Sequence, residues 1–175
     1  MGKLKAFVGH SFNEEDEDVI RTFLKHFDSL KDIGFEWEHA ERAEAKELAV
    51  KVKEKMEGKN LFIGIFTRKN KQIPPPLLKP CFLNRQYVKA LNNQYVWTTS
   101  DWVLQESGYA LGKGLNLIFL VEKGVETIGG LQGNLEYISF ERENIPQSFT
   151  KLNEIITSLV RIEATEIHKA AKDSP

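Results

Sequence analysis

The chain has 175 residues, 41% of them hydrophobic and 28% charged, a composition typical of one globular domain that buries its own core. Lys and Arg (24) nearly balance Asp and Glu (25), and the net charge of −1 argues against nucleic acid as the main partner. The single cysteine excludes an intramolecular disulfide, and no apolar run approaches the roughly 20 residues that cross a bilayer, so we expect a cytoplasmic protein without a membrane segment.

The first half of the sequence alternates short apolar runs with stretches of helical apolar spacing. This pattern predicts a strand at 4–8, a helix at 13–30, a strand at 35–38 and a helix at 45–56. Asn13 is the predicted N-cap of the first helix, and Gly58 is the predicted stop of the second. The run 61–66 is apolar at every position except Gly64, which indicates a central parallel strand covered on both faces.

The second half continues the same alternation. It predicts a helix at 100–111, strands at 115–121 and 137–140, and a last helix that opens at Pro146, a favoured first helical position. Five strands alternating with helices predict an α/β fold, a flavodoxin-like doubly wound five-stranded parallel sheet with strand order 2-1-3-4-5.

The predicted domain covers residues 1–165, and residues 166–175 form a tail or a linker. One connection breaks the regular alternation, because about 30 residues at 69–99, rich in proline and then in aromatic residues, separate the third strand from the next helix. Connections of this length are often lids or binding loops. The alternative is a surface loop with a short helix near 84–91.

Topology alone indicates where a ligand would bind. In open parallel sheets, ligands bind beyond the carboxyl ends of the strands, where the strand order reverses. For the order 2-1-3-4-5 this point lies between the first and third strands. The loop after the first strand, with Gly9 and His10, and the helix with Trp102 and Glu106 should therefore line the crevice.

Glu106 stands out on that helix. At 100° per residue it falls inside an arc that also holds Trp102, Val103, Ser107, Ala110 and Leu111. An acid in such an arc costs free energy unless it is paired or hydrogen-bonded, so Glu106 has either a structural partner or a functional role. Helix geometry leaves both alternatives open.

Two motifs carry a family resemblance. The segment Asp101-Trp102-Val103-Leu104-Gln105-Glu106, followed by Ala110-Leu111, resembles the third-helix motif of catalytic TIR (Toll/interleukin-1 receptor) domains of bacteria, in which a Trp lies four residues before the catalytic Glu. The opening Ala6-Phe7-Val8-Gly9-His10-Ser11-Phe12 resembles the first strand and loop of the same family. The resemblance covers residues 3–159, except for the proline-rich insertion.

The resemblance implies cleavage of the nicotinamide–ribose bond of NAD⁺, giving ADP-ribose or a cyclic isomer, in prokaryotic antiphage defence signalling. NAD⁺ is then the substrate and no cofactor is needed. It also implies self-association through TIR surfaces and a sensor or effector partner, or a fused domain. Glu106 becomes the catalytic residue, stabilising a ribose cation. The implied substrate-binding residues are Gly9, His10, Ser11, Phe12, Arg42 and Trp102.

Two other function classes stay open. A noncatalytic TIR-type module would use the fold only for self-association as an adaptor, and Glu106 would then be incidental. A nucleoside deoxyribosyltransferase-like enzyme would also use a Glu on a similar sheet, through a covalent glycosyl intermediate. The four histidines are scattered and show no metal-ligand spacing, so we expect no metal.

Overall fold

The computed structural model describes residues 3–40, 50, 52–74, 94–126 and 135–172. Its strands are β1 (Leu4–His10), β2 (Phe35–His39), β3 (Leu61–Phe66), β4 (Asn70–Gln72), β5 (Val96–Thr98), β6 (Asn116–Glu122) and β7 (Leu135–Phe140). Its α-helices include α1 (Glu17–Asp28), α3 (Asp101–Gly112) and α4 (Phe149–Lys172), and residues 50 and 52–55 of the predicted helix at 45–56 are helical too. Short 3₁₀ helices occupy Glu14–Asp16, Lys31–Ile33 and Arg142–Ser148.

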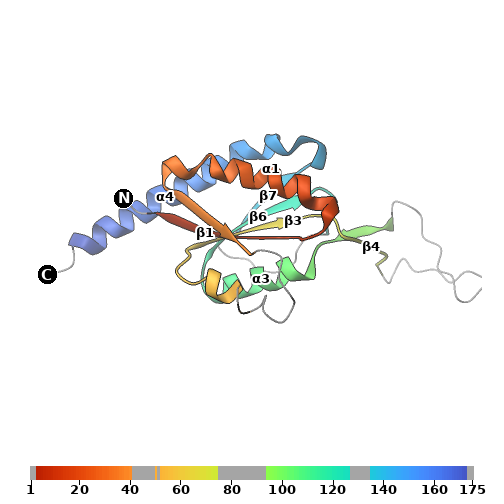
Figure 1. Ribbon diagram of the computed structural model, residues 1–175, viewed down its shortest axis with the longest axis horizontal. Helices are drawn as coiled ribbons and strands as arrows, with labels where there is room; N and C mark the ends of the chain where they lie inside the picture. The colour runs from red at the N-terminus through yellow and green to blue at the C-terminus, as the bar shows by residue number, and fades with distance from the viewer. Residues whose placement is uncertain (1–2, 41–49, 51, 75–93, 127–134, 173–175) are drawn as a thin grey trace, which may run out of the picture.

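One parallel sheet organises the chain. Its strands follow the order β2-β1-β3-β6-β7, and every neighbouring pair in it is parallel. The predicted order 2-1-3-4-5 is therefore confirmed, since β6 and β7 are the fourth and fifth strands of this sheet along the chain. Figure 1 shows α1 and α4 on one face and α3 on the other, the doubly wound arrangement that the alternating pattern predicted.

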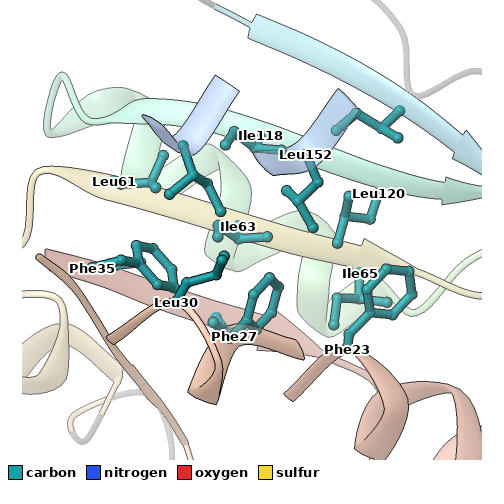
Figure 2. Packing of buried hydrophobic residues seen from close by; sticks show 14 of the residues in the cluster. Phe23, Phe27, Leu30, Phe35, Leu61, Ile63, Ile65, Ile118, Leu120 and Leu152 are labelled. Atoms are coloured by element: carbon teal, nitrogen blue, oxygen red, sulfur yellow. The ribbon is translucent and has the colours of Figure 1, made fainter. Parts of the chain in front are cut away.

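The face covered by α1 and α4 holds the larger core. Alternate residues of β1 and β3 point to this face, as the two-residue period of a strand requires. Figure 2 shows the side chains of β3 between those of α1 and α4, with Phe23 and Phe27 of α1 beside Ile63 and Ile65. The amphipathic α1 exposes its charged side, so burial of its apolar side is what fixes it to the sheet.

The opposite face, under α3, is built largely from phenylalanine. Phe7, Phe62, Phe66 and Phe119 are fully or almost fully buried there and pack against Val103 of α3. Each of the four rings lies on a strand position that alternates with those of the other core. Glycines occupy other strand positions on this face, and they leave room for side chains of α3 that point toward the sheet.

One local prediction is confirmed in part, and two are wrong. Asn13 is the N-cap residue of the 3₁₀ turn Glu14–Asp16 that leads into α1, but its side chain makes no capping hydrogen bond. The last α-helix begins at Phe149 and not at Pro146, since Pro146 lies in the 3₁₀ segment Arg142–Ser148 that precedes it. Leu111, placed in the buried arc of α3, is 36% exposed.

The insertion at 69–99 contains a structure that its sequence did not predict. β4 and β5 form a separate antiparallel ribbon, which Figure 1 shows projecting away from the sheet. Two cations approach the ring of Trp97 in β5, with Lys71 Nζ 4.9 Å and Arg68 Cζ 6.0 Å from its centre. The short helix expected near 84–91 lies outside the described residues. The tail expected from 166 onward continues α4, which ends at Lys172.

A buried ionic network ties the carboxyl ends of the strands to the first helical segment. Asp16 and Glu122 are 2% and 1% exposed, and the Arg142 guanidinium bonds both, at 2.7 Å and at 2.9–3.0 Å. The Thr67 hydroxyl donates to the second oxygen of Asp16 (2.7 Å), and the Arg68 amide donates to Glu122 (2.9 Å). Hydrogen bonds to both acids raise the pKa of Arg142. Each buried charge is therefore matched.

Replacing Arg142 with Met should lower the free energy of unfolding by about 3 kcal/mol, because two buried carboxylates lose the cation that they share. Urea denaturation followed by circular dichroism measures this loss. The matched control is Arg21→Met, which removes an exposed arginine–aspartate pair and should leave the midpoint nearly unchanged. Equal losses in the two variants would contradict the structural role of the network.

Candidate active site

The helix α3 brings Glu106 onto the sheet. Ser100 is its N-cap residue, and the buried side of the helix presents Val103, Glu106, Ser107 and Ala110 toward β1 and β3. Glu106 is 3% exposed, as its place in the predicted arc implied. An acid therefore lies where the helix otherwise buries small and apolar side chains.

The two oxygens of the Glu106 carboxyl have different surroundings. The indole N–H of Trp102, one helical turn earlier, donates to Oε1 at 2.7 Å. Oε2 is buried and has no hydrogen-bond partner in the part of the chain that the structure describes. Trp102 thus orients the carboxyl and leaves one oxygen without a partner.

Gly9 makes this placement possible. A Cβ atom on Gly9 would collide with Glu106 Oε2 and would lie 2.8 Å from Cζ of the Phe62 ring. The partner of Gly9 across β1 and β3 is Gly64, where a Cβ would meet the rings of Phe62 and Phe66. These adjacent glycines form a notch in the sheet that accepts the carboxyl and the phenylalanine rings.

Burial changes the acidity of Glu106. Desolvation raises its pKa from 4.5 to about 8, and the Trp102 hydrogen bond only partly opposes this shift. At neutral pH the carboxyl is therefore mostly protonated and uncharged. It can donate a proton, or become an anion when a nearby positive charge stabilises the ionised form.

The notch lies at the topological switch point. Gly9 is the last residue but one of β1, and the strand order reverses between β1 and β3. A small cavity of about 130 Å³ opens beside the carboxyl. It is lined by Val52, Lys53, Trp102, Gln105, Glu106 and Tyr109. The carboxyl thus occupies the position where open α/β sheets bind their ligands.

The structure separates the predicted site residues into two groups. Gly9 contacts Glu106, whereas His10 points to the opposite face, because neighbouring residues of a strand alternate. His10 Nε2 lies 2.8 Å from Nδ1 of His39, and both residues line a second cavity with Ser11. The Ser11 carbonyl accepts a hydrogen bond from His10 Nδ1 at 2.8 Å.

Phe12 and Arg42 complete the predicted set. Phe12 packs against the core under α3, and its ring also contacts His10 at 5.2 Å between centres, so it borders both groups. Arg42 lies outside the described residues. Sequence reasoning did not identify Gln105, Tyr109 or Lys53 as lining residues. The spacing of Tyr109, one turn beyond Glu106, was the one available signal.

Other kinds of site receive no support from the described residues. Within those ranges, no three His, Cys, Asp or Glu side chains gather closely enough to hold a metal ion. Among the helices that the structure describes, none has the length and apolar character to cross a membrane.

Comparison with known proteins supports the fold. No protein-family model matches the chain, and no curated protein matches it. Among solved structures, it is similar to the CMP N-glycosidase BcmB of Clostridium botulinum, with a TM-score of 0.51 and 16% identity. The match covers 85% of this chain and 98% of that one. At this identity the similarity establishes the doubly wound α/β fold alone.

Replacing Gly9 with Ala should destabilise the protein by roughly 1–3 kcal/mol, because the new methyl group displaces the Glu106 carboxyl or the Phe62 ring. The loss should be smaller when Glu106 is also Ala, which removes one of the colliding groups. Gly108→Ala is the control, since a Cβ there meets open space on a helix and should stabilise by about 0.5–1 kcal/mol. An unchanged stability for Gly9→Ala would contradict the close approach.

The raised pKa of Glu106 predicts a specific dependence of stability on pH. Its contribution is fully present below 4.5, where the carboxyl is protonated in both states, and is lost as pH rises to about 8. The free energy of unfolding of the wild type, minus that of Glu106→Gln, should therefore fall across this window and level off above it. Urea titrations at several pH values measure the difference. A flat difference would show that the carboxyl titrates normally.

Proposed function

We propose that this protein cleaves an N-glycosidic bond between a ribose and a nitrogenous base, with Glu106 as the catalytic carboxyl. The observation that carries the proposal is the buried Oε2 atom of Glu106, which has no partner among the described residues and lies at the switch point of the sheet. The similar BcmB structure is that of a CMP N-glycosidase, and cleavage of CMP by that enzyme belongs to the same class of reaction.

A purely structural role explains Glu106 poorly. The buried ionic network shows how this fold accommodates acids that serve stability, because there each carboxylate meets cations or hydroxyl donors. Glu106 has one donor, Trp102, and its raised pKa means that ionisation is disfavoured in the folded state. Buried ionisable groups with strongly shifted pKa values are typical of sites that act on a bound ligand.

The chemistry follows from the position of the Glu106 carboxyl beside the cavity of about 130 Å³ that this residue lines. When the C–N bond breaks, its electron pair leaves with the base, and positive charge develops on the ribose. An anion held close to this carbon stabilises the charge without reorganisation, because Trp102 already fixes the carboxyl. Water then adds to the ribose carbon and loses a proton, which completes hydrolysis.

NAD⁺ is the first substrate that we propose, on the basis of the TIR-like motif around Trp102 and Glu106. Its nicotinamide ring carries a positive charge at the bond that breaks and leaves as a neutral molecule. That charge favours the ionised form of a neighbouring carboxyl, which offsets the effect of burial on the pKa. In this scheme Glu106 acts as an anion, and assembly through TIR-type surfaces completes the site.

A nucleoside monophosphate is the second candidate, favoured by the similarity to the CMP N-glycosidase. Its base is neutral and leaves more easily when it is protonated. The protonated Glu106 carboxyl, present at neutral pH, can supply that proton. The two substrates therefore require opposite ionisation states of the same residue.

The test is to incubate the purified protein, at high concentration, with NAD⁺, CMP and deoxynucleosides, and to measure the released bases by chromatography. Glu106→Gln should lower the rate at least about 100-fold, because it removes the charge and the titrating proton. Glu154→Gln on the exposed side of α4 is the matched control and should keep full activity. Undiminished release of base by the Glu106 variant would refute the assignment.

The pH profile then distinguishes the substrates. With NAD⁺ the rate should rise as Glu106 ionises, whereas with CMP it should fall above about 8 as the proton is lost. Exchange of bases between deoxynucleosides would instead support a covalent glycosyl intermediate. Absence of base release from every substrate, with oligomerisation enforced by a fused assembly domain, would support the noncatalytic alternative.

A further inference from the structure

The cavity beside Glu106 has the size of one six-membered ring. Its volume of about 130 Å³ falls below the roughly 300–1,000 Å³ usual for sites that hold a whole small molecule. A cavity of about 150 Å³ inside a protein is enough to bind benzene. The cavity can therefore hold a single ring of a nucleotide, and the rest of such a ligand must lie outside it.

Two aromatic side chains of α3 form walls of this cavity. Trp102 and Tyr109 are seven residues apart, close to two helical turns, so their side chains leave the helix on the same side. Both line the cavity, and Val52, from the segment that precedes β3, adds aliphatic surface. Such a lining suits a planar, largely apolar ring.

Both aromatic walls have fixed neighbours. The Trp102 indole N–H donates to Glu106 Oε1 at 2.7 Å. The Tyr109 ring lies near two ammonium groups, with Lys113 Nζ 5.7 Å and Lys53 Nζ 5.9 Å from its centre. The width of the cavity is therefore set by side chains that already have partners, and a larger ring could enter only if those contacts changed.

The lining residues differ in exposure, and this gives the cavity a direction. Lys53 and Gln105 are exposed, whereas Val52 and Glu106 are buried. A ring that enters from solvent therefore approaches Glu106, and the polar ribose stays at the open end beside Lys53 and Gln105. The reverse orientation would place the ribose hydroxyl groups against aromatic and aliphatic walls, where they would lose hydrogen bonds to water.

We propose that this cavity is the pocket for the leaving base, and that it selects bases with one six-membered ring, namely pyrimidines and nicotinamide, over purines. The inference rests on the function proposed above and adds the class of base to it. A purine has a second ring fused to the first and is joined to ribose through that five-membered ring. With its six-membered ring in the cavity, a purine would hold the C–N bond farther from Glu106, where the carboxyl cannot assist cleavage.

The first experiment measures the binding of free bases, so it does not require catalysis. Cytosine, nicotinamide and adenine are titrated into ¹⁵N-labelled protein, and the indole N–H signals are followed by NMR. The chain has three tryptophans, and Trp102→Phe identifies the Trp102 signal by its disappearance. We expect cytosine and nicotinamide to move that signal with a Kd on the order of 1 mM, and adenine to bind at least about tenfold more weakly.

Variants of Tyr109 test the wall that sets the size of the cavity. Tyr109→Ala removes the ring and should raise the affinity for adenine, relative to that for cytosine, about tenfold. Tyr109→Phe is the matched control, because it keeps the ring and should keep the preference of the wild type. The same ratio is then measured in turnover, where kcat/KM for CMP should exceed that for AMP at least about tenfold in the wild type and approach it in Tyr109→Ala.

The two proposals fail in different ways. If cytosine moves the Trp102 signal and adenine does not, but no substrate is cleaved, the proposed function is refuted and the pocket for a single ring stands. The pocket is refuted if no base moves the signal, or if adenine moves it at the same concentrations as cytosine. It is also refuted if Tyr109→Phe changes the preference as much as Tyr109→Ala does.

Discussion

The approach of the Glu106 carboxyl to the backbone of β1 is the constraint on which the site depends. An acid can reach the sheet there because Gly9 has no side chain, and the Phe62 ring fills the remaining space. Water is thereby excluded from Oε2, which disfavours the anion and raises the pKa of the carboxyl. The tight packing at Gly9 and the raised pKa of Glu106 thus both result from this one close approach. Trp102 adds orientation, since its N–H holds the first oxygen.

The buried acids near the carboxyl ends of the strands differ in how well hydrogen bonds and ion pairs satisfy them. Asp16 and Glu122 share the Arg142 guanidinium and further donors, so their hydrogen bonds link the 3₁₀ segment Arg142–Ser148, β6 and the 3₁₀ turn Glu14–Asp16 that precedes α1. Glu106 lacks such compensation. A domain of this size can bear one poorly satisfied carboxyl when other buried acids, such as Asp16 and Glu122, are well bonded. The ionic network therefore supplies stability that the site itself does not.

Much of the fold follows from apolar patterning, and part of the site does as well. The parallel sheet and its strand order follow from the alternation of apolar runs with helical segments, and the burial of Glu106 follows from the 3.6-residue period of its helix. The β4–β5 ribbon has short exposed strands without alternation, so no pattern marks it. Grouping His10 with Glu106 by topology failed for another reason: adjacent strand residues face opposite ways, and the switch point does not specify a face.

The alternation at the end of β1 also limits how the sequence can change. Gly9 faces the carboxyl and His10 faces the other cavity, so inserting or deleting one residue within β1 would exchange the two faces. An imidazole would then collide with Glu106, and the histidine pair would be lost. The segment from Leu4 to His10 must therefore keep its residue count for both arrangements to form.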